Sequence, residues 1–181
     1  MPAHIFIATS LDGFIARPDG DIDWLTPTPE MAELSQGEDY GYDAFMASID
    51  ALVMGRHSFE KVLTFDVWPY GDKPVVVLSS KSIRINPNLA GSVSHLSGEP
   101  KYICDELAHR GLRELYVDGG NTAQRFLAAG VVDRVIITRV PVVLGAGIPL
   151  FGKTPSDLRL LHMRTQAFVN GMVQSEYRVP R

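Results

Sequence analysis

Short apolar runs alternate with segments of helical spacing over the first two-thirds of the chain. Residues 4–9, 51–54 and 74–78 are short, mostly apolar runs, as is typical of strands that are covered on both faces, and residues 113–117 form a further predicted strand. Such alternation predicts right-handed crossover connections and a mainly parallel sheet. The helices are predicted at residues 29–35, 42–48, 56–63, 100–110 and 121–129.

The last third of the chain contains strand patterns alone. Residues 135–143 form a long apolar run, and Asn170-Gly171 is a strong hairpin signal between the last two strand patterns. We therefore expect one α/β domain over residues 1–181, with a mainly parallel central sheet, helices on both faces and a C-terminal antiparallel hairpin. The run 135–143 is also a candidate homodimer interface, although ordinary core gives the same pattern.

Composition narrows the class of protein. The 181 residues have 45% hydrophobic content, enough for a packed core, and the formal net charge of -4 offers no basic surface for nucleic acid. A single cysteine, Cys104, excludes an internal disulfide, and with no signal-peptide pattern we expect a cytoplasmic protein. No apolar run approaches the ~20 residues that span a bilayer. The scattered histidines give no metal-ligand spacing.

Glycine, hydroxyl and cationic residues follow three of the predicted parallel strands. Because the carboxyl ends of parallel strands meet at one edge of a sheet, ligands bind there. Backbone amides at a helix start and an arginine fork suit a ligand with phosphate groups, although glycines that only shape turns are the alternative. The three motifs are Gly55-Arg56-His57-Ser58, Ser79-Ser80-Lys81 and Asp118-Gly119-Gly120-Asn121-Thr122.

Five segments together carry a family pattern. They are Ser-Leu-Asp-Gly-Phe-Ile-Ala at 10–16, Met-Gly-Arg-His-Ser-Phe-Glu at 54–60, Val-Leu-Ser-Ser at 77–80, Asp-Gly-Gly-Asn at 118–121 and Val-Leu-Gly-Ala-Gly-Ile-Pro-Leu-Phe at 143–151. The pattern resembles the dihydrofolate reductase superfamily, and within it the reductase domain of the bifunctional riboflavin-biosynthesis deaminase/reductase. The resemblance implies a three-layer dihydrofolate reductase-like fold. One cysteine cannot supply the deaminase zinc ligands, so the chain is similar to stand-alone reductase-like members.

The resemblance also implies NADPH as the cofactor. Arg56, with Gly55, His57 and Ser58, matches the site for the 2′-phosphate, and the preference for NADPH over NADH rests mainly on Arg56. Other positions match the adenosine wall, the pyrophosphate turn and the nicotinamide neighbours. These are Leu78, Ser79 and Ser80 for the wall, Gly119, Gly120, Asn121, Thr122 and Ala123 for the turn, and Ala8 and Ile15 for the nicotinamide.

The expected chemistry is hydride transfer to a C=N or C=O bond of a small, heterocyclic substrate. Asp12 is the candidate general acid or orienting residue, and a turn-capping aspartate is the alternative reading. Trp24 and Phe151 are candidates for stacking on the substrate, and either also suits the core. Asp118 stands where folate enzymes carry an apolar residue, and Gln124 replaces an expected aromatic residue. These departures argue against folate.

Two other functions remain open. A 5-amino-6-(5-phosphoribosylamino)uracil reductase of riboflavin biosynthesis needs a further cation for the substrate phosphate, and Arg17 or Arg139 is a candidate. A non-catalytic NADPH-binding module needs no catalytic acid at all.

Overall fold

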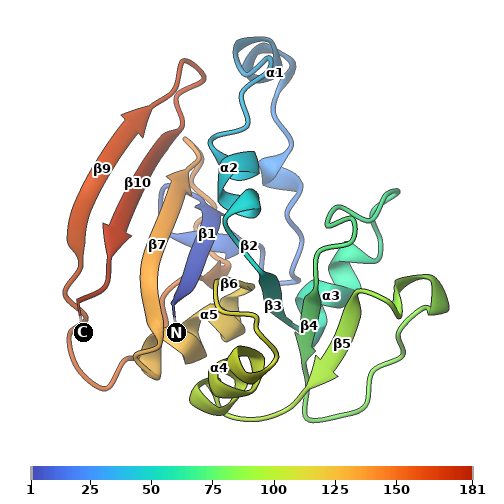
Figure 1. Cartoon of the computed structure of the whole chain (residues 1–181). Coiled ribbons are helices and arrows are strands. Elements are labelled where there is room, and N and C mark those ends of the chain that lie inside the picture. Colours follow the sequence, from blue (N-terminus) through green and yellow to red (C-terminus); the bar gives the residue numbers. More distant parts are fainter. Residues whose placement is uncertain (1, 181) are drawn as a thin grey trace.

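The computed structural model describes residues 2–180, and within them most of the chain forms one mixed sheet flanked by helices (Figure 1). The eight-stranded sheet has the order β5-β4-β3-β6-β1-β7-β10-β9. Its strands are β1 (Ala3–Thr9), β3 (Ala51–Gly55), β4 (Val75–Leu78), β5 (Val93–Leu96), β6 (Leu115–Asp118), β7 (Val132–Arg139), β9 (Leu161–Ala167) and β10 (Val173–Arg178). The helices are α1 (Pro29–Leu34), α2 (Tyr42–Ala47), α3 (Arg56–Val62), α4 (Pro100–His109) and α5 (Gly120–Ala128), with 3-10 turns at Asp23–Leu25 and Pro87–Leu89.

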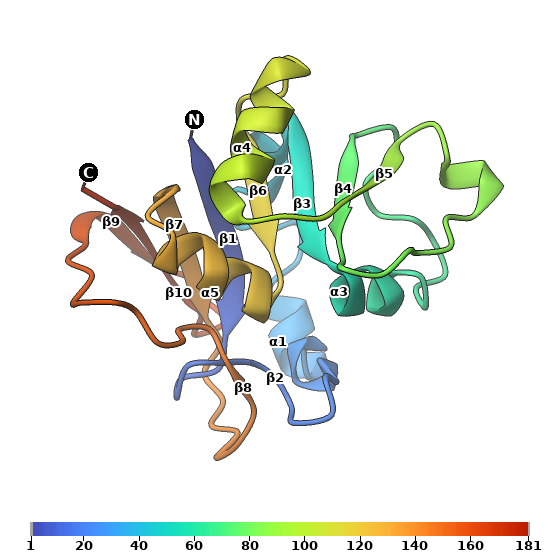
Figure 2. The same ribbon diagram turned by 90° about the horizontal axis from the view of Figure 1, so that it is seen from below.

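Helices lie on both faces of the sheet (Figures 1 and 2), and an apolar cluster is buried on each face. On one face, α4 and α5 bury Ile103 and Phe126 against β1, β3 and β6. On the other face, α2 and α3 bury Phe45 and Phe59 against the same strands. Helices therefore lie on both faces, as the alternating pattern predicts, and the continuously apolar strands are covered on both sides.

Six strands, β5, β4, β3, β6, β1 and β7, form the parallel part of the sheet, so their carboxyl ends meet at one rim. β3 pairs in parallel with β4 and β6, and β1 pairs in parallel with β6 and β7. β10 is antiparallel to both β7 and β9, as the hairpin signal predicts. The loops that follow β1, β3, β4 and β6 therefore lie at the same edge, which is the arrangement the sequence required for a ligand site.

The expected strand 135–143 is displaced. β7 begins at Val132 and ends at Arg139, because Pro141 cannot donate to a sheet ladder. β7 is an inner strand between β1 and β10, and Val135 and Ile136 lie in the two cores. The part of this stretch that lies in β7 is therefore core, and the dimer interface stays a prediction. The exposed edge is β9, whose seven residues are all exposed.

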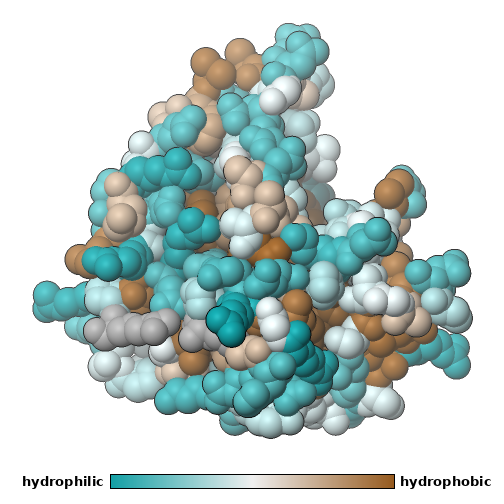
Figure 3. All heavy atoms as spheres, viewed as in Figure 1, coloured by the Kyte–Doolittle hydropathy of each residue, from teal (hydrophilic) through white to brown (hydrophobic). Residues whose placement is uncertain are grey.

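A small second sheet lies over the rim and was not expected. β2 (Phe14–Ala16) pairs antiparallel with β8 (Ile148–Pro149), which joins the segment after β1 to the glycine-rich loop after β7. Polar and apolar residues are interspersed over the surface seen in Figure 3. Across residues 2–180, the structure contains no helix that is both long and apolar enough to cross a membrane.

The tip of the hairpin holds the segment between α1 and α2. The buried Asn170 donates from Nδ2 to the hydroxyl groups of Ser35 and Tyr40, both at 2.6 Å. Gln174 donates to the carbonyl oxygen of Tyr40 at 2.9 Å. Tyr40 has a positive φ of 56°, which is unusual for a residue other than glycine. These bonds fix the chain where it enters α2.

Candidate functional site

The first turns of α3 and α5 lie against each other at the rim. Gly55 precedes α3 and Gly119 precedes α5. A Cβ on Gly55 would lie 3.0 Å from the Thr122 hydroxyl oxygen, and a Cβ on Gly119 would overlap the Ser58 hydroxyl. Each glycine thus faces the third residue of the other helix. The two glycines let the helix starts of neighbouring strands β3 and β6 come together.

Both helix starts lack side-chain caps. Thr28 caps α1 by accepting from the Met31 amide, but neither Gly55 nor Gly119 offers such a group. The structure gives the first three amides of each helix no hydrogen-bond acceptor within residues 2–180. Unpaired amides at a helix start carry partial positive charge and suit an anion. These amides belong to Arg56, His57, Ser58, Gly120, Asn121 and Thr122.

Arg56 adds a cation beside these amides. Its Nε donates to Glu60 Oε1 at 2.6 Å, and the side chain remains partly exposed. The two terminal nitrogens of its guanidinium face no other acceptor in the described chain, so they are available to a phosphate group. The His57 side chain is 95% exposed and lies 3.6 Å from Glu60. The arrangement fits a ligand with one phosphate at the helix starts and another at Arg56.

The expected adenosine wall is only partly available. Leu78 is buried in the core. The Ser79 hydroxyl accepts from the Lys81 amide at 3.0 Å, and the Ser79 carbonyl contacts the His95 ring at 2.8 Å. Ser80 is exposed beside them. These bonds shape the loop after β4, and Ser80 is its free hydroxyl.

Gly120 has a packing role that the sequence did not indicate. A Cβ there would lie 2.8 Å from Ile15 Cδ1 and 3.1 Å from Ile148 Cγ2. The small β2–β8 sheet therefore rests on the start of α5, and Ile15 is held over the rim. Ala123 is wrong as a cofactor contact, because its side chain is fully buried and its amide bonds to the Gly119 carbonyl.

Asp12 holds two loops together. Its Oδ1 accepts from the Ser10 hydroxyl at 2.6 Å and from the Leu144 amide at 3.1 Å, and its Oδ2 accepts from the Gly145 amide at 2.8 Å. The Ser10 hydrogen bond, followed by these amides, lowers the pKa of Asp12 to about 2. An ionised carboxylate with both oxygens occupied is a poor proton donor at neutral pH. The geometry fits the turn-capping reading of Asp12.

A second acidic residue, Asp118, lies at the centre of the rim on the α2 face. It is the last residue of β6, immediately before Gly119, and its Oδ1 lies 3.5 Å from the Tyr116 hydroxyl. Burial, followed by the charge of Asp118, raises the pKa of Tyr42 of α2 and of Tyr70 in the loop before β4. We call these residues the tyrosine cluster: Tyr42, Tyr70 and Tyr116 around Asp118.

Burial dominates the chemistry of the tyrosine cluster. It raises the pKa of Asp118, against the opposing effects of the Gly119 amide and the Tyr116 hydroxyl. Burial and the Asp118 charge raise the pKa of Tyr42 to about 12. A carboxyl group of this kind keeps its proton to higher pH than an exposed aspartate, which makes Asp118 a better general acid than Asp12. In the sequence, only the Asp-Gly-Gly motif marked this part of the site, because the three tyrosines come from separate segments.

Ala8 shares the face of Asp118. Tyr116 pairs with His4 in the β1–β6 ladder, and side chains alternate along a strand, so His4, Phe6 and Ala8 point to this face. Ala8 in turn pairs with Thr138 of β7. Ala8 and Asp118 thus face the same side of the sheet near the rim.

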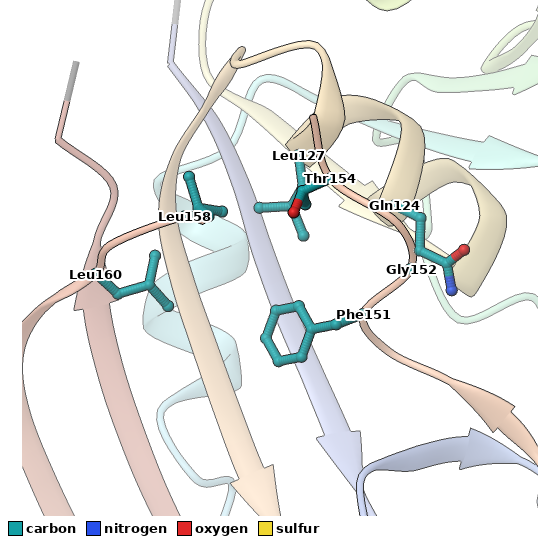
Figure 4. Close-up of a pocket in the computed structure, with 7 residues that line it drawn as sticks. All are labelled: Gln124, Leu127, Phe151, Gly152, Thr154, Leu158 and Leu160. Atoms are coloured by element: carbon teal, nitrogen blue, oxygen red, sulfur yellow. The ribbon is translucent and has the colours of Figure 1, made fainter. Parts of the chain in front are cut away.

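Trp24 and Phe151 lie in different environments. Trp24 is only 9% exposed, and its indole Nε1 has no hydrogen-bond partner among residues 2–180. Phe151 is 48% exposed and lines an apolar groove of about 260 Å³ on the α5 side (Figure 4). The sheet separates this groove from the tyrosine cluster, so Phe151 cannot stack on a substrate held by Asp118. The groove is lined by Gln124, Leu127, Phe151, Gly152, Thr154, Leu158 and Leu160.

The two candidate cations for a substrate phosphate also differ. Arg17 donates to both carboxylate oxygens of Asp23, at 2.6 and 3.1 Å. Arg139 is exposed at the end of β7 beside Thr9, with no ion pair to a described residue. Residues 2–180 contain no group of His, Cys, Asp and Glu side chains that could hold a metal ion.

Known proteins resemble this chain over nearly its whole length. The model of the RibD C-terminal domain family matches residues 4–174. YwjB of Bacillus subtilis (strain 168), an uncharacterised protein, is 33% identical over 167 residues, covering 91% of this chain and 90% of the relative. A crystal structure from Shewanella sp. PV-4, provisionally named as a riboflavin biosynthesis protein, is 39% identical, covers all of both chains and has a TM-score of 0.90.

A more distant structure extends the fold comparison. It is a diaminohydroxyphosphoribosylaminopyrimidine deaminase/5-amino-6-(5-phosphoribosylamino)uracil reductase from Thermotoga maritima, with a TM-score of 0.73 and 16% identity. The match covers 99% of this chain and 56% of the longer one. At this identity the similarity concerns the fold alone. The fold predicted from the sequence is confirmed.

Proposed function

The chain belongs to the RibD C-terminal domain family, and on that premise we propose that it is an NADPH-dependent reductase acting on a C=N or C=O bond of a small heterocyclic substrate. The observation that carries the proposal is the pair of uncapped helix starts beside Arg56. They place three unpaired amides from each helix next to a guanidinium group. This combination matches the anionic groups of NADPH.

We assign groups of the chain to three parts of the cofactor. The diphosphate would bind the amides of Gly120, Asn121 and Thr122, and the 2′-phosphate would bind the terminal nitrogens of Arg56. Ile15, packed against Gly120, and Ala8 would flank the nicotinamide. When bound, NADPH supplies the hydride.

Asp118 replaces Asp12 as the proposed proton donor. Asp118 is adjacent to the Gly119 turn and shares a face with Ala8, so it lies beside the position of the nicotinamide. Burial raises the pKa of Asp118, so its carboxyl group holds a proton to higher pH than an exposed aspartate does, and the Tyr116 hydroxyl lies beside it. Asp12 instead holds the 144–145 loop against the segment after β1.

The aminopyrimidine phosphate reductase remains a second candidate because of the family and the Thermotoga maritima fold. It requires a cation for the substrate phosphate, and Arg139 is the residue that is not already paired. Turnover of 5-amino-6-(5-phosphoribosylamino)uracil that is lost in Arg139→Ala would favour it. A non-catalytic module would bind NADPH but would not oxidise it, whichever class of substrate is added.

Titration with NADPH and NADH tests the cofactor directly. Trp68 contacts Tyr70 and Phe59 in edge-to-face geometry, close to the proposed site, so ligand binding should quench its fluorescence. We expect saturable quenching with tighter binding of NADPH than of NADH. The absence of binding by both cofactors would contradict the proposal.

A further inference from the structure

We infer that the chain has a second ligand site, for a small anion with an apolar body, at the end of the sheet opposite the rim. The site lies where β7 begins and β10 ends, at the lower edge of the sheet in Figure 1. Arg134 at this end and Arg139 at the rim both belong to β7, and the strand separates them by about 17 Å. The inference does not depend on the proposed reductase function.

Two arginine side chains lie directly opposite each other at this end of the sheet. Arg134 of β7 pairs with Arg178 of β10 in the antiparallel ladder, so both side chains point to the same face. This is the α2 face, because the guanidinium carbon of Arg134 lies 5.6 Å from the centre of the Phe45 ring. Side chains in directly opposite positions have Cβ atoms about 5 Å apart, and like charges placed in this way repel each other. The pair therefore requires negative charge beside it.

One carboxylate, that of Glu176, is shared among three arginines here. Its Oε2 accepts from Arg164 Nε at 2.8 Å, whereas Arg134 Nη1 reaches its Oε1 only at 3.5 Å. The Nε of Arg134 is buried without a hydrogen-bond partner. Within residues 2–180, the exposed side chain of Arg178 has no ion pair and no hydrogen bond. Glu176 therefore leaves much of the positive charge of the opposed arginines unbalanced.

The two opposed arginines line a pocket of about 460 Å³, a volume in the range of small-molecule sites. A second acid in its wall, Asp133, is already engaged, because its Oδ2 accepts from the Ala3 amide at 3.2 Å. The rest of the wall has an apolar part, formed by Met163, Val179 and Pro180. The pocket thus combines free donors with an apolar surface.

The ligand that fits this wall is an acceptor of hydrogen bonds. Terminal N–H groups of Arg134 and Arg178 can bind two oxygens of one carboxylate or phosphate group. A ring or a short aliphatic body would then cover the apolar part of the wall. The bound anion would also supply the negative charge that the opposed arginines lack. Small organic acids and phosphate monoesters share this chemistry.

Calorimetric titration with four probes tests the site. The probes are benzoate, phenyl phosphate, inorganic phosphate and, as a cation of similar shape, benzylamine. All titrations use Arg56→Ala protein at low ionic strength, so that Arg56 at the rim does not contribute. We expect saturable binding of benzoate or phenyl phosphate and none of benzylamine. Adding Arg178→Gln should weaken this binding about ten-fold or more. Adding Arg159→Gln, an exposed change outside the pocket, should leave it unchanged.

Arg178→Glu separates a ligand site from a merely structural arginine. The variant replaces a like-charged pair by an oppositely charged one, so without ligand its urea midpoint should be higher than that of the wild type. Benzoate or phenyl phosphate should raise the midpoint of the wild type but not that of the variant. A lower midpoint for the variant without ligand would contradict the repulsion between the two arginines.

The probes also decide the class of ligand. Binding of only one of the two organic anions supports the site and identifies its ligand as a carboxylic acid or as a phosphate ester. Inorganic phosphate that binds as tightly as phenyl phosphate would overturn the apolar part of the site. The whole inference would be overturned by the absence of saturable anion binding, by equal binding in Arg178→Gln, or by tighter binding of benzylamine.

Discussion

The hydroxyl of Tyr116 lies 3.5 Å from Asp118 but 2.9 Å from the carbonyl oxygen of Phe6, so its single proton goes to the backbone. Asp118 is consequently a partly buried acid with little support for its charged form, and desolvation raises its pKa. The folded protein therefore binds this proton more tightly than the unfolded chain does. The stability that the neutral Asp118 carboxyl group contributes is fully present at low pH. It is lost as the pH rises above the ordinary aspartate pKa of 3.8.

Asp118→Asn tests this relationship without a substrate. The amide cannot ionise, so the free energy of unfolding of the variant should increase relative to that of the wild type as the pH is raised from about 4 to 8. Urea unfolding across that range measures the difference. A difference that stays constant with pH would contradict the proton-holding Asp118.

Asp12 should show the opposite dependence on pH. Hydrogen bonds from Ser10 and from the Leu144 and Gly145 amides lower its pKa to about 2 from an ordinary value of 3.8. Its stabilisation is present above the ordinary value and is lost as the pH falls towards 2. Asp12→Asn should therefore be less stable than wild type at pH 7, by a margin that shrinks in acid. Asp105→Asn, an exposed change on α4, is the control and should show no such margin.

The sequence predicted the fold better than it predicted the site, for physical reasons. Local apolar periodicity is enough to locate β1, β3, β4 and the helices, because each pattern lies within one segment. β2 and β8 have only three and two residues, too few for a pattern. The partners of Asp12 include Leu144 and Gly145, more than 130 residues away. No local spacing reports such contacts.

The residue types at the rim were identified, but some of their roles were not. Gly119 and Arg56 lie where the motifs place them. Gly120 allows Ile15 to pack on α5, which depends on a small sheet that local patterns do not predict. Asp118 departs from the folate pattern, yet its three tyrosines are brought together only by the tertiary fold.

Gly119→Ala should destabilise the protein for two separable reasons. The residue has φ of 87°, and its Cβ would overlap Ser58. We expect a loss of about 1–3 kcal/mol from backbone strain, with a further loss from the overlap. Gly130→Ala is the matched control, because Gly130 has φ of 66° and no atom near the added Cβ. In the double variant, Ser58→Gly should restore only the part of the stability that the overlap removed, and urea unfolding measures this. If the effects of the two substitutions on the free energy of unfolding simply add, the two helix starts do not touch.

We expect a homodimer that uses the edge strand β9. Its edge is unpaired and its residues are exposed on both faces, including Leu161 and Met163. Light scattering after size-exclusion chromatography should give a dimer mass for wild type and a monomer mass for Met163→Glu. Val67→Glu is the control, since Val67 is equally apolar and more exposed but lies between α3 and β4. A wild-type monomer would contradict this expectation.

Binding of NADPH and NADH to Arg56→Ala and Arg110→Ala is the most direct test of the cofactor site. Both arginines are exposed and pair with a glutamate on the same helix, Arg56 with Glu60 and Arg110 with Glu106, but only Arg56 lies at the rim. A charged contact to a phosphate contributes about 1.5–3 kcal/mol, so Arg56→Ala should weaken NADPH binding by roughly 10- to 150-fold and leave NADH nearly unchanged. Arg110→Ala should bind both cofactors as wild type does. Equal loss of NADPH and NADH in Arg56→Ala, or no preference in wild type, would contradict a 2′-phosphate site at Arg56.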